Sequence, residues 1–220
     1  MSGQQSHVTN RLAQFIAGSQ WEAIPPEVRR EGVRGLLNFV GCALGGAHDE
    51  AMDIAVKVLT PFFGQPQATV IGRGERPDAL NAAFLNAVSA NVLEYDDTHL
   101  ATVMHPAAPV APGLFALADL RAVSGREFLH AFIVGVEISC RVGLGVMPTH
   151  YRRGWHSTAT CGGVTTSDSR AAAVWYSMTC VRSRGPKRRA AGCAVAPASA
   201  VTRAAPAASP APVSWRTRGW

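Results

Sequence analysis

The feature that most restricts the fold of this 220-residue chain is the point at which its large aliphatic side chains stop. Residues 165–220 contain no Leu, no Ile and no Phe, and Ala, Arg, Ser and Pro make up most of this segment. A segment without large apolar side chains cannot bury enough surface to offset the entropy that it loses on ordering. The hydrophobic core must therefore come from residues 1–164, and we expect residues 165–220 to form a disordered tail.

The change in composition near residue 164 is abrupt, and it falls just after CGGV, where a helix would begin. Ala, Arg, Pro and Gly are the residues that GC-rich codons yield when they are read in a shifted frame. Two interpretations of residues 165–220 follow: a genuine basic tail, or a segment translated out of frame.

The pattern of residues 1–164 predicts helices. Apolar residues recur three and four positions apart after Pro26, and Gly45-Gly46 ends that run. Asp78 is placed to cap a further helix, and Ser124 with Glu127 has the spacing of a capping box. Because this part shows no alternating strand pattern, we predict an all-α fold. The predicted helices cover about 8–18, 26–44, 50–60, 79–95, 110–121 and 125–144, with a short extended piece at 67–72.

Charge is divided unevenly along the chain, whose formal net charge is +6. Residues 1–164 carry a net charge of −2 and residues 165–220 a net charge of +8. Such a tail can bind nucleic acid non-specifically. No recognition motif accompanies it, so we expect no nucleic-acid partner.

Other features of the composition bear on location. The uncharged run 101–118 is interrupted by three prolines, whereas a membrane-spanning helix needs about 20 apolar residues, so we expect no membrane partner. The five cysteines lack metal-ligand spacing, and the polar N-terminus lacks a secretory signal. We expect a cytoplasmic protein with reduced thiols.

The chemistry of the first segment gathers in NVLEYDDTHLATVMHP, residues 91–106. Crowded carboxylates repel one another and spread their pKa values, which suits acid–base catalysis. If the helix continues through this stretch, Glu94 and Asp97 share one face and Asp96 points elsewhere. His105 precedes a proline, which holds its backbone extended. A solvated helix end is the simpler alternative.

A second stretch, GWHSTATCG at 154–162, places His156 just before Ser157, a good N-cap residue. A helix N-terminus presents free N–H groups and the positive end of the helix dipole. This environment favours a neutral imidazole and can bind a substrate carboxylate.

Metal ligation is an alternative use of the first stretch. Its side chains include ligand types for zinc or iron. Their spacing matches no strong metal motif, and we assign no metal. The residues concerned are Asp96, Asp97, His99 and His105.

Together the two stretches resemble the signatures of the MmgE/PrpD family, which includes 2-methylcitrate dehydratase and cis-aconitate decarboxylase. LEYDDTHLATVMHPAAPVAPGLFALAD resembles the first signature and GWHSTATCG the second, and the resemblance covers roughly residues 8–164. It implies a homodimeric lyase that removes water or CO₂ from a small di- or tricarboxylate without a metal or other cofactor. The best expectation is an elimination of water like that of 2-methylcitrate dehydratase.

The resemblance also implies roles for single residues. Glu94 stands where many family members have Asp. The implied catalytic residues are Glu94, Asp96, Asp97, His105 and His156, and the implied substrate-binding residues are Thr98 and Ser157.

Family members carry an α/β lid domain with the lysines that bind substrate carboxylates, and nothing in residues 165–220 resembles it. We therefore expect a truncated or frameshifted chain that is inactive alone. Two other functions stay open: a non-catalytic helical dimerisation module, and a nucleic-acid binder that uses the basic tail. The residues do not choose between dehydratase, decarboxylase and isomerase, nor do they identify the general base.

Overall fold

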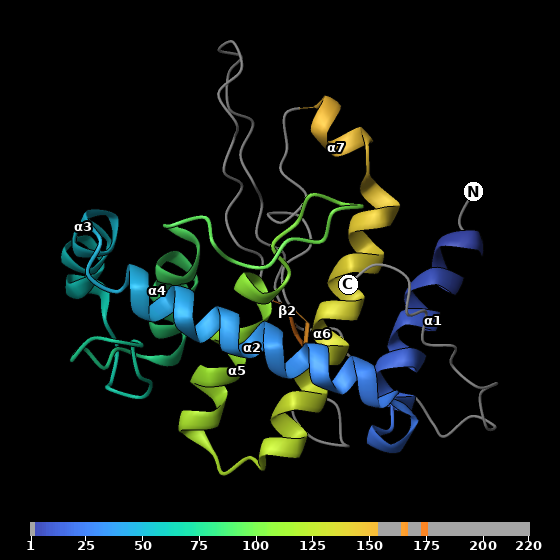
Figure 1. Ribbon diagram of the computed structural model, residues 1–220, viewed down its shortest axis with the longest axis horizontal. Coiled ribbons are helices and arrows are strands. Elements are labelled where there is room, and N and C mark those ends of the chain that lie inside the picture. Colours follow the sequence, from blue (N-terminus) through green and yellow to red (C-terminus); the bar gives the residue numbers. More distant parts are fainter. Residues whose placement is uncertain (1–2, 154–163, 167–172, 176–220) are drawn as a thin grey trace.

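The computed structural model describes residues 3–153, 164–166 and 173–175 of the chain (Figure 1). Residues 3–153 are helices joined by short irregular segments, which confirms the predicted all-α class. Their helices are α1 (Gly3–Gly18), η1 (Trp21–Ala23), α2 (Pro26–Gly46), α3 (Glu50–Leu59), η2 (Thr60–Phe62), α4 (Ala79–Asn91), α5 (Ala107–Leu120), α6 (Gly125–Val146) and α7 (Thr149–Arg152), where η marks a 3₁₀ helix.

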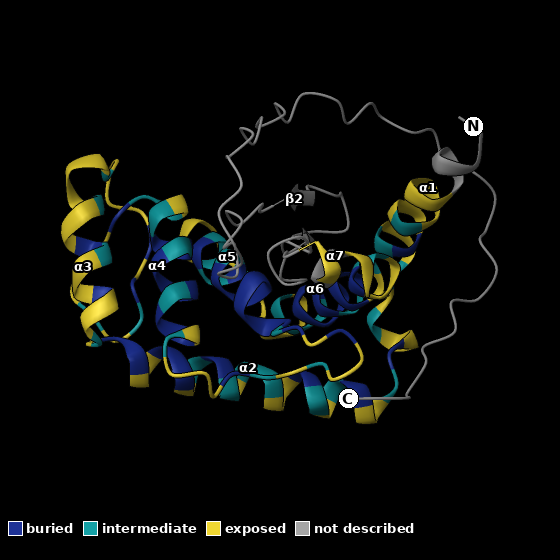
Figure 2. Cartoon of the chain, turned by 90° about the horizontal axis from the view of Figure 1, so that it is seen from above, coloured by how far each residue is buried: buried dark blue, intermediate teal, exposed yellow. Residues whose placement is uncertain are grey.

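Helices α2, α4, α5 and α6 form the centre of the fold. Helix α2 packs along α4, α5 and α6, and α5 packs between α4 and α6. Figure 1 shows α2 crossing the molecule, with α3 near one of its ends and α1 near the other. Burial follows this arrangement, because α3 and α1 are largely exposed while α5 and much of α6 are buried (Figure 2).

The main core cluster lies where these four helices meet. Phe39 of α2 is fully buried, and its ring stacks on Phe115 of α5 with 5.7 Å between the centroids. Full burial of such a side chain stabilises the fold by about 2 kcal/mol. The helices approach closely, since a Cβ at Gly46 would lie only 2.1 Å from the Ser89 carbonyl oxygen. The buried members are Phe39, Cys42, Ala43, Ala90, Ala107, Val110, Ala111, Leu114, Ala131, Phe132, Val136 and Cys140.

The predicted helix starts are confirmed at both capping sites. The Asp78 side chain accepts hydrogen bonds from the first backbone N–H groups of α4. Ser124 and Glu127 form the expected capping box at the start of α6. The predicted end of α4 is wrong, because the helix stops at Asn91 and Glu94 adopts a left-handed backbone with φ of 55°.

Two further segments bear on the sequence analysis. Residues 67–72 are described as turns and irregular backbone, so the extended piece does not pair as a strand. Within the described part of the chain, α6 alone is long and apolar enough to cross a membrane. More than half of its most apolar window is buried inside the molecule, as in a core helix.

Part of the C-terminal segment is also described. Strand β1 (Val164–Thr166) pairs antiparallel with β2 (Ala173–Trp175), and Val164 lies opposite Trp175. Strand β1 lies against α6 and α5. This short hairpin was not predicted. Residues 167–172 and 176–220 lie outside the described residues, so the expected disorder of the tail stays a prediction.

Candidate active site

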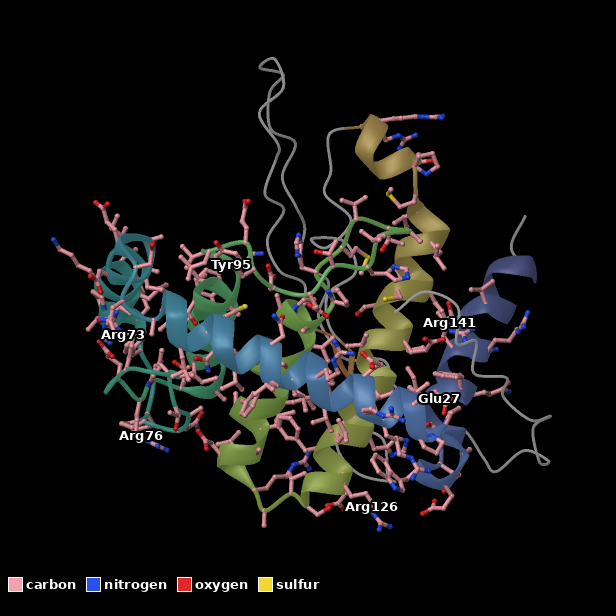
Figure 3. All side chains as sticks on the ribbon, in the orientation of Figure 1. Glu27, Arg73, Arg76, Tyr95, Arg126 and Arg141 are labelled. Carbon is pink, nitrogen blue, oxygen red and sulfur yellow. The ribbon has the colours of Figure 1, made fainter. Side chains whose placement is uncertain are left out.

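The candidate site lies in the segment that joins α4 to α5, residues 92–106, which we call the acidic loop. Its first turn forms as α4 ends, where the Glu94 N–H donates to the Asn91 carbonyl at 3.0 Å. Helix α2 holds the next residue, because Asn38 Nδ2 donates to the Tyr95 carbonyl oxygen at 3.1 Å. The Tyr95 side chain is 77% exposed and projects away from the helices (Figure 3). The acidic loop is therefore tied to the core by its backbone.

Asp96 is the inward-facing acid of the acidic loop, with a side chain that is only 1% exposed. Its Oδ2 accepts a hydrogen bond from Asn91 Nδ2 at 3.0 Å. Its Oδ1 lies 3.3 Å from Nδ1 of His105, whose side chain is 24% exposed. A buried carboxylate is costly unless polar groups compensate its charge. Asn91, at the end of α4, supplies a hydrogen bond, and His105 adds an opposite charge beside Oδ1 when it is protonated.

Asp97 reaches the first turn of α5. Its Oδ1 accepts a hydrogen bond from the Ala107 backbone N–H at 3.0 Å. Burial raises the pKa of Asp97 to about 6, and the neighbouring Asp96 charge also raises it, whereas the Ala107 N–H and His105 lower it. A carboxyl group with this pKa can hold or release a proton near neutral pH.

Glu94 and Thr98 are exposed at the surface of the acidic loop. Our expectation that Glu94 and Asp97 share a helix face is wrong, because α4 has already ended at Asn91. Asp96 faces the interior, with a side chain that is buried. The structure brings Asp96 and His105 together, and it places Glu94 and Thr98 at the solvent edge.

The middle of the acidic loop is a tight turn from His99 to Met104. The His99 N–H donates to the Met104 carbonyl at 2.8 Å, and His99 Nδ1 lies 2.7 Å from Thr102 Oγ1. Burial lowers the pKa of His99. The turn packs closely on α6, where a Cβ at Gly143 would come within 2.4 Å of Met104 Sδ. His99 therefore anchors the loop.

Helix α2 contributes two residues that our sequence analysis did not select. Asn38 and Cys42 lie one turn apart, and Asn38 holds the acidic loop. Burial raises the pKa of the Cys42 thiol, and the charges of Asp96 and Asp97 raise it further. Cys42 therefore lies near the acid pair. Asn38 is a polar residue among apolar neighbours in α2, and this was the signal in the sequence that could have identified it.

His156 and Ser157, the two candidates of the second stretch, lie outside the described residues. The metal alternative finds no support in the described part, where no three His, Cys, Asp or Glu side chains gather as ligands.

The fold and site define an all-α domain that presents a buried carboxylate and a histidine between two core helices. The chain belongs to the MmgE/PrpD family, since the family model described as the MmgE/PrpD N-terminal domain matches residues 10–208. This finding confirms the resemblance in the two signatures. The match runs past residue 164, and the proposed boundary there stays a prediction.

Curated relatives agree with this assignment. A cis-aconitate decarboxylase-like protein of Aspergillus oryzae is 31% identical over 166 residues, which are 72% of this chain and 34% of the relative. Cis-aconitate decarboxylase of Aspergillus terreus is 28% identical over 167 residues, 73% of this chain and 34% of that enzyme. The Homo sapiens cis-aconitate decarboxylase is 31% identical over 141 residues, which are 61% of this chain and 29% of that enzyme. The chain thus spans about a third of the length of these relatives.

Proposed function

We propose that this chain is the helical part of a lyase that acts on a small di- or tricarboxylate. His105 and the carboxylates of the acidic loop are its acid–base groups. The supporting observation is the 3.3 Å approach of His105 Nδ1 to the buried Asp96 carboxylate. A carboxylate at one imidazole nitrogen sets the tautomer and leaves the other nitrogen to accept a proton.

Loss of water from a hydroxy acid needs a base for the proton alpha to a carboxylate and an acid for the departing hydroxyl. His105 is suited to take the proton at Nε2. Asp97, with a pKa of about 6, is suited to supply one. Negative charge builds on the substrate carboxylate during this step, and positive groups or helix N-termini must stabilise it. Family resemblance assigns that role to lysines of a lid domain.

Loss of CO₂ uses the same groups differently. The electron pair of the broken C–C bond stays on carbon, and a protonated His105 is suited to deliver a proton there. The names of the relatives favour this reaction with cis-aconitate over dehydration of 2-methylcitrate. Both reactions keep His105 as the central group, so one variant tests both.

A chimera tests the proposal directly. Residues 10–153 of this chain would replace the aligned part of the Aspergillus terreus enzyme, and turnover of cis-aconitate and 2-methylcitrate would be measured. Loss of a general acid–base group typically slows a reaction by 10²- to 10⁴-fold. We expect at least a 100-fold fall in kcat/KM for His105→Ala. A folded chimera with no turnover of either substrate would contradict the proposal.

His130→Ala is the matched control, because His130 contacts Ser19 and Trp21 instead of the acidic loop. We expect kcat/KM of this variant within about twofold of the parent chimera, as for a residue outside the site. The 220-residue chain assayed alone should show no turnover above its own His105→Ala variant. Turnover by the chain alone would contradict its expected inactivity.

We also propose that the protein is a cytoplasmic homodimer. Three apolar side chains on the outer face of α2, Val33, Leu37 and Leu44, are 53%, 72% and 54% exposed. Exposed apolar stripes of this kind mark interaction surfaces. The same surface favours the second candidate function, a dimerisation module without turnover. Light scattering of the chain and of Leu37→Glu measures the association, and a monomeric parent chain would contradict it.

A further inference from the structure

A polar relay connects α4 to the start of α5 through the acidic loop. Asn91, the last residue of α4, donates from Nδ2 to Asp96 Oδ2 at 3.0 Å. The other oxygen of the same carboxylate, Oδ1, lies 3.3 Å from His105 Nδ1. Asp96 thus has one oxygen hydrogen-bonded to the asparagine and the other at ion-pair distance from the histidine, in an approach that does not have the geometry of a hydrogen bond.

The two oxygens of Asp96 are chemically equivalent until a neighbour distinguishes them. The Asn91 amide does so, because its NH₂ group donates and does not ionise. The Asp96 side chain is buried, so solvent does not compete for Oδ2. A carboxylate held in this way has its rotamer fixed, and the remaining oxygen keeps one direction.

The tautomer of His105 depends on where Asp96 Oδ1 is held. Which imidazole nitrogen carries the proton is set by the group that the other nitrogen faces. A carboxylate beside Nδ1 favours the Nδ1–H tautomer, in which Nε2 is the proton acceptor. Groups behind a functional histidine commonly orient its ring in this way.

We propose that Asn91 is a positioning residue, which clamps Asp96 so that its Oδ1 stays close to Nδ1 of His105 and, by its charge, favours the Nδ1–H tautomer. Only the use of this tautomer in catalysis rests on the proposed lyase function. Asn91 itself is exposed, so we expect its replacement to leave the core intact.

The tautomer is measured by long-range ¹H–¹⁵N correlation on the full 220-residue chain with ¹⁵N-labelled histidine, at a pH where His105 is neutral. We expect the Nδ1–H form to dominate. In Asn91→Ala we expect the ratio of Nδ1–H to Nε2–H to fall roughly tenfold, a change of about 1.4 kcal/mol. In Asn91→Gln, which keeps the amide donor, we expect most of the original ratio to be retained.

Asn81→Ala is the matched control on the same helix. Asn81 Nδ2 donates to Asp78 Oδ2 at 2.7 Å, which is the same kind of amide–carboxylate bond at the opposite end of α4. Its loss should leave the His105 tautomer unchanged. Far-UV circular dichroism of each variant verifies that the helices are kept.

The Asp96→Asn variant shows how far the tautomer ratio of His105 shifts when the carboxylate is lost entirely. If Asp96→Asn shifts the tautomer and Asn91→Ala does not, Asn91 only ends the helix and the inference is overturned. A parent chain with His105 in the Nε2–H form would also overturn it. This readout needs no turnover, so failure of the lyase proposal in the chimera assay is a separate result.

Discussion

Two irregular segments of this molecule lead into core helices, and each places an aspartate at the helix entry. Residues 63–78, which we call the Arg73 loop, end at Asp78, which accepts bonds from backbone N–H groups of three residues and from the Asn81 amide. Burial raises the pKa of Asp78, but these donors outweigh it and hold the pKa at about 2. In the acidic loop, Asp97 accepts from Ala107 N–H, and burial raises its pKa to about 6.

The charged groups near the two aspartates also differ. In the Arg73 loop, Arg73 bonds to both oxygens of Glu75 and to Asp53, and its bonds to Glu75 lower the pKa of that carboxyl. In the acidic loop two adjacent carboxylates share the neighbourhood of one histidine. A cluster of donors around an acid indicates a structural role, whereas a buried acid with a raised pKa, such as Asp97, is typical of active sites.

Backbone conformation separates the two segments as well. The left-handed position of the Arg73 loop is Gly72, with φ of 76°, where a side chain would also collide with Ala47. The acidic loop places Glu94 and Val103 in this conformation, with φ of 55° and 50°. Non-glycine residues there store strain, and such strain clusters at functional sites. The acidic loop therefore carries backbone strain at two non-glycine residues, whereas the Arg73 loop uses a glycine at its left-handed position.

The largest effect is expected from Asp78→Ala, which tests the structural side of this comparison. Loss of the cap should lower the free energy of unfolding by about 2 kcal/mol at pH 7. Because the folded pKa lies below the unfolded value of 3.8, the charge stabilises the fold above about pH 4 and this contribution is lost as pH falls toward 2. Urea denaturation at pH 7 and pH 3 measures both values. An equal loss at both pH values would show that the charge does not contribute.

A smaller effect of opposite sign is expected from Asp97→Asn. The folded pKa of about 6 lies above the unfolded value of 3.8, so the native carboxyl destabilises the fold as pH rises from about 4 to 6. Asparagine keeps an acceptor for the Ala107 N–H without this charge. We expect a gain of about 1 kcal/mol above pH 6, reduced from the full shift because Asp97 is partly exposed, and none below pH 4.

Urea denaturation between pH 4 and pH 7.5 measures this gain, and Asp119→Asn is its control. Asp119 accepts the Thr69 N–H at 2.7 Å from an exposed position. A loss of stability in Asp97→Asn that grows as pH rises from 4 to 7.5 would mean that the Ala107 bond needs the charge, and Asp97 would then resemble Asp78.

The helix starts were predictable because local chemistry determines them. Asp78 and the Ser124–Glu127 box lie next to the backbone groups that they cap, so short spacing reveals them. The end of α4 was not predictable in this way. No glycine or proline marks Glu94, and contacts from other positions, such as Asn38 on Tyr95, hold the turn. The sequence pattern therefore predicted a helix that extends past Asn91, where α4 ends.

The candidate site was likewise predictable only in part. The residue types and spacing of Asp96, Asp97 and His105 were visible in the sequence and in the family resemblance. Their pairing was not, because it depends on how the acidic loop crosses between α4 and α5. Asn91 and Cys42 were missed for this reason, since their relation to the acids exists only after the helices pack.

The smallest effect is expected from Glu94→Gly, which tests whether the acidic loop stores strain. Glycine adopts the left-handed conformation without the Cβ clash, but it also increases the entropy of the unfolded chain. We expect a net gain of about 0.5 kcal/mol in the free energy of unfolding, measured by urea denaturation at pH 7. Glu94→Ala is the control, since it removes the carboxylate and keeps the Cβ, and it should leave stability nearly unchanged. If alanine and glycine stabilise equally, repulsion between the Glu94 carboxylate and its acidic neighbours is the cause. If glycine alone stabilises, the strain lies in the backbone, and the loop keeps a glutamate there at the expense of stability.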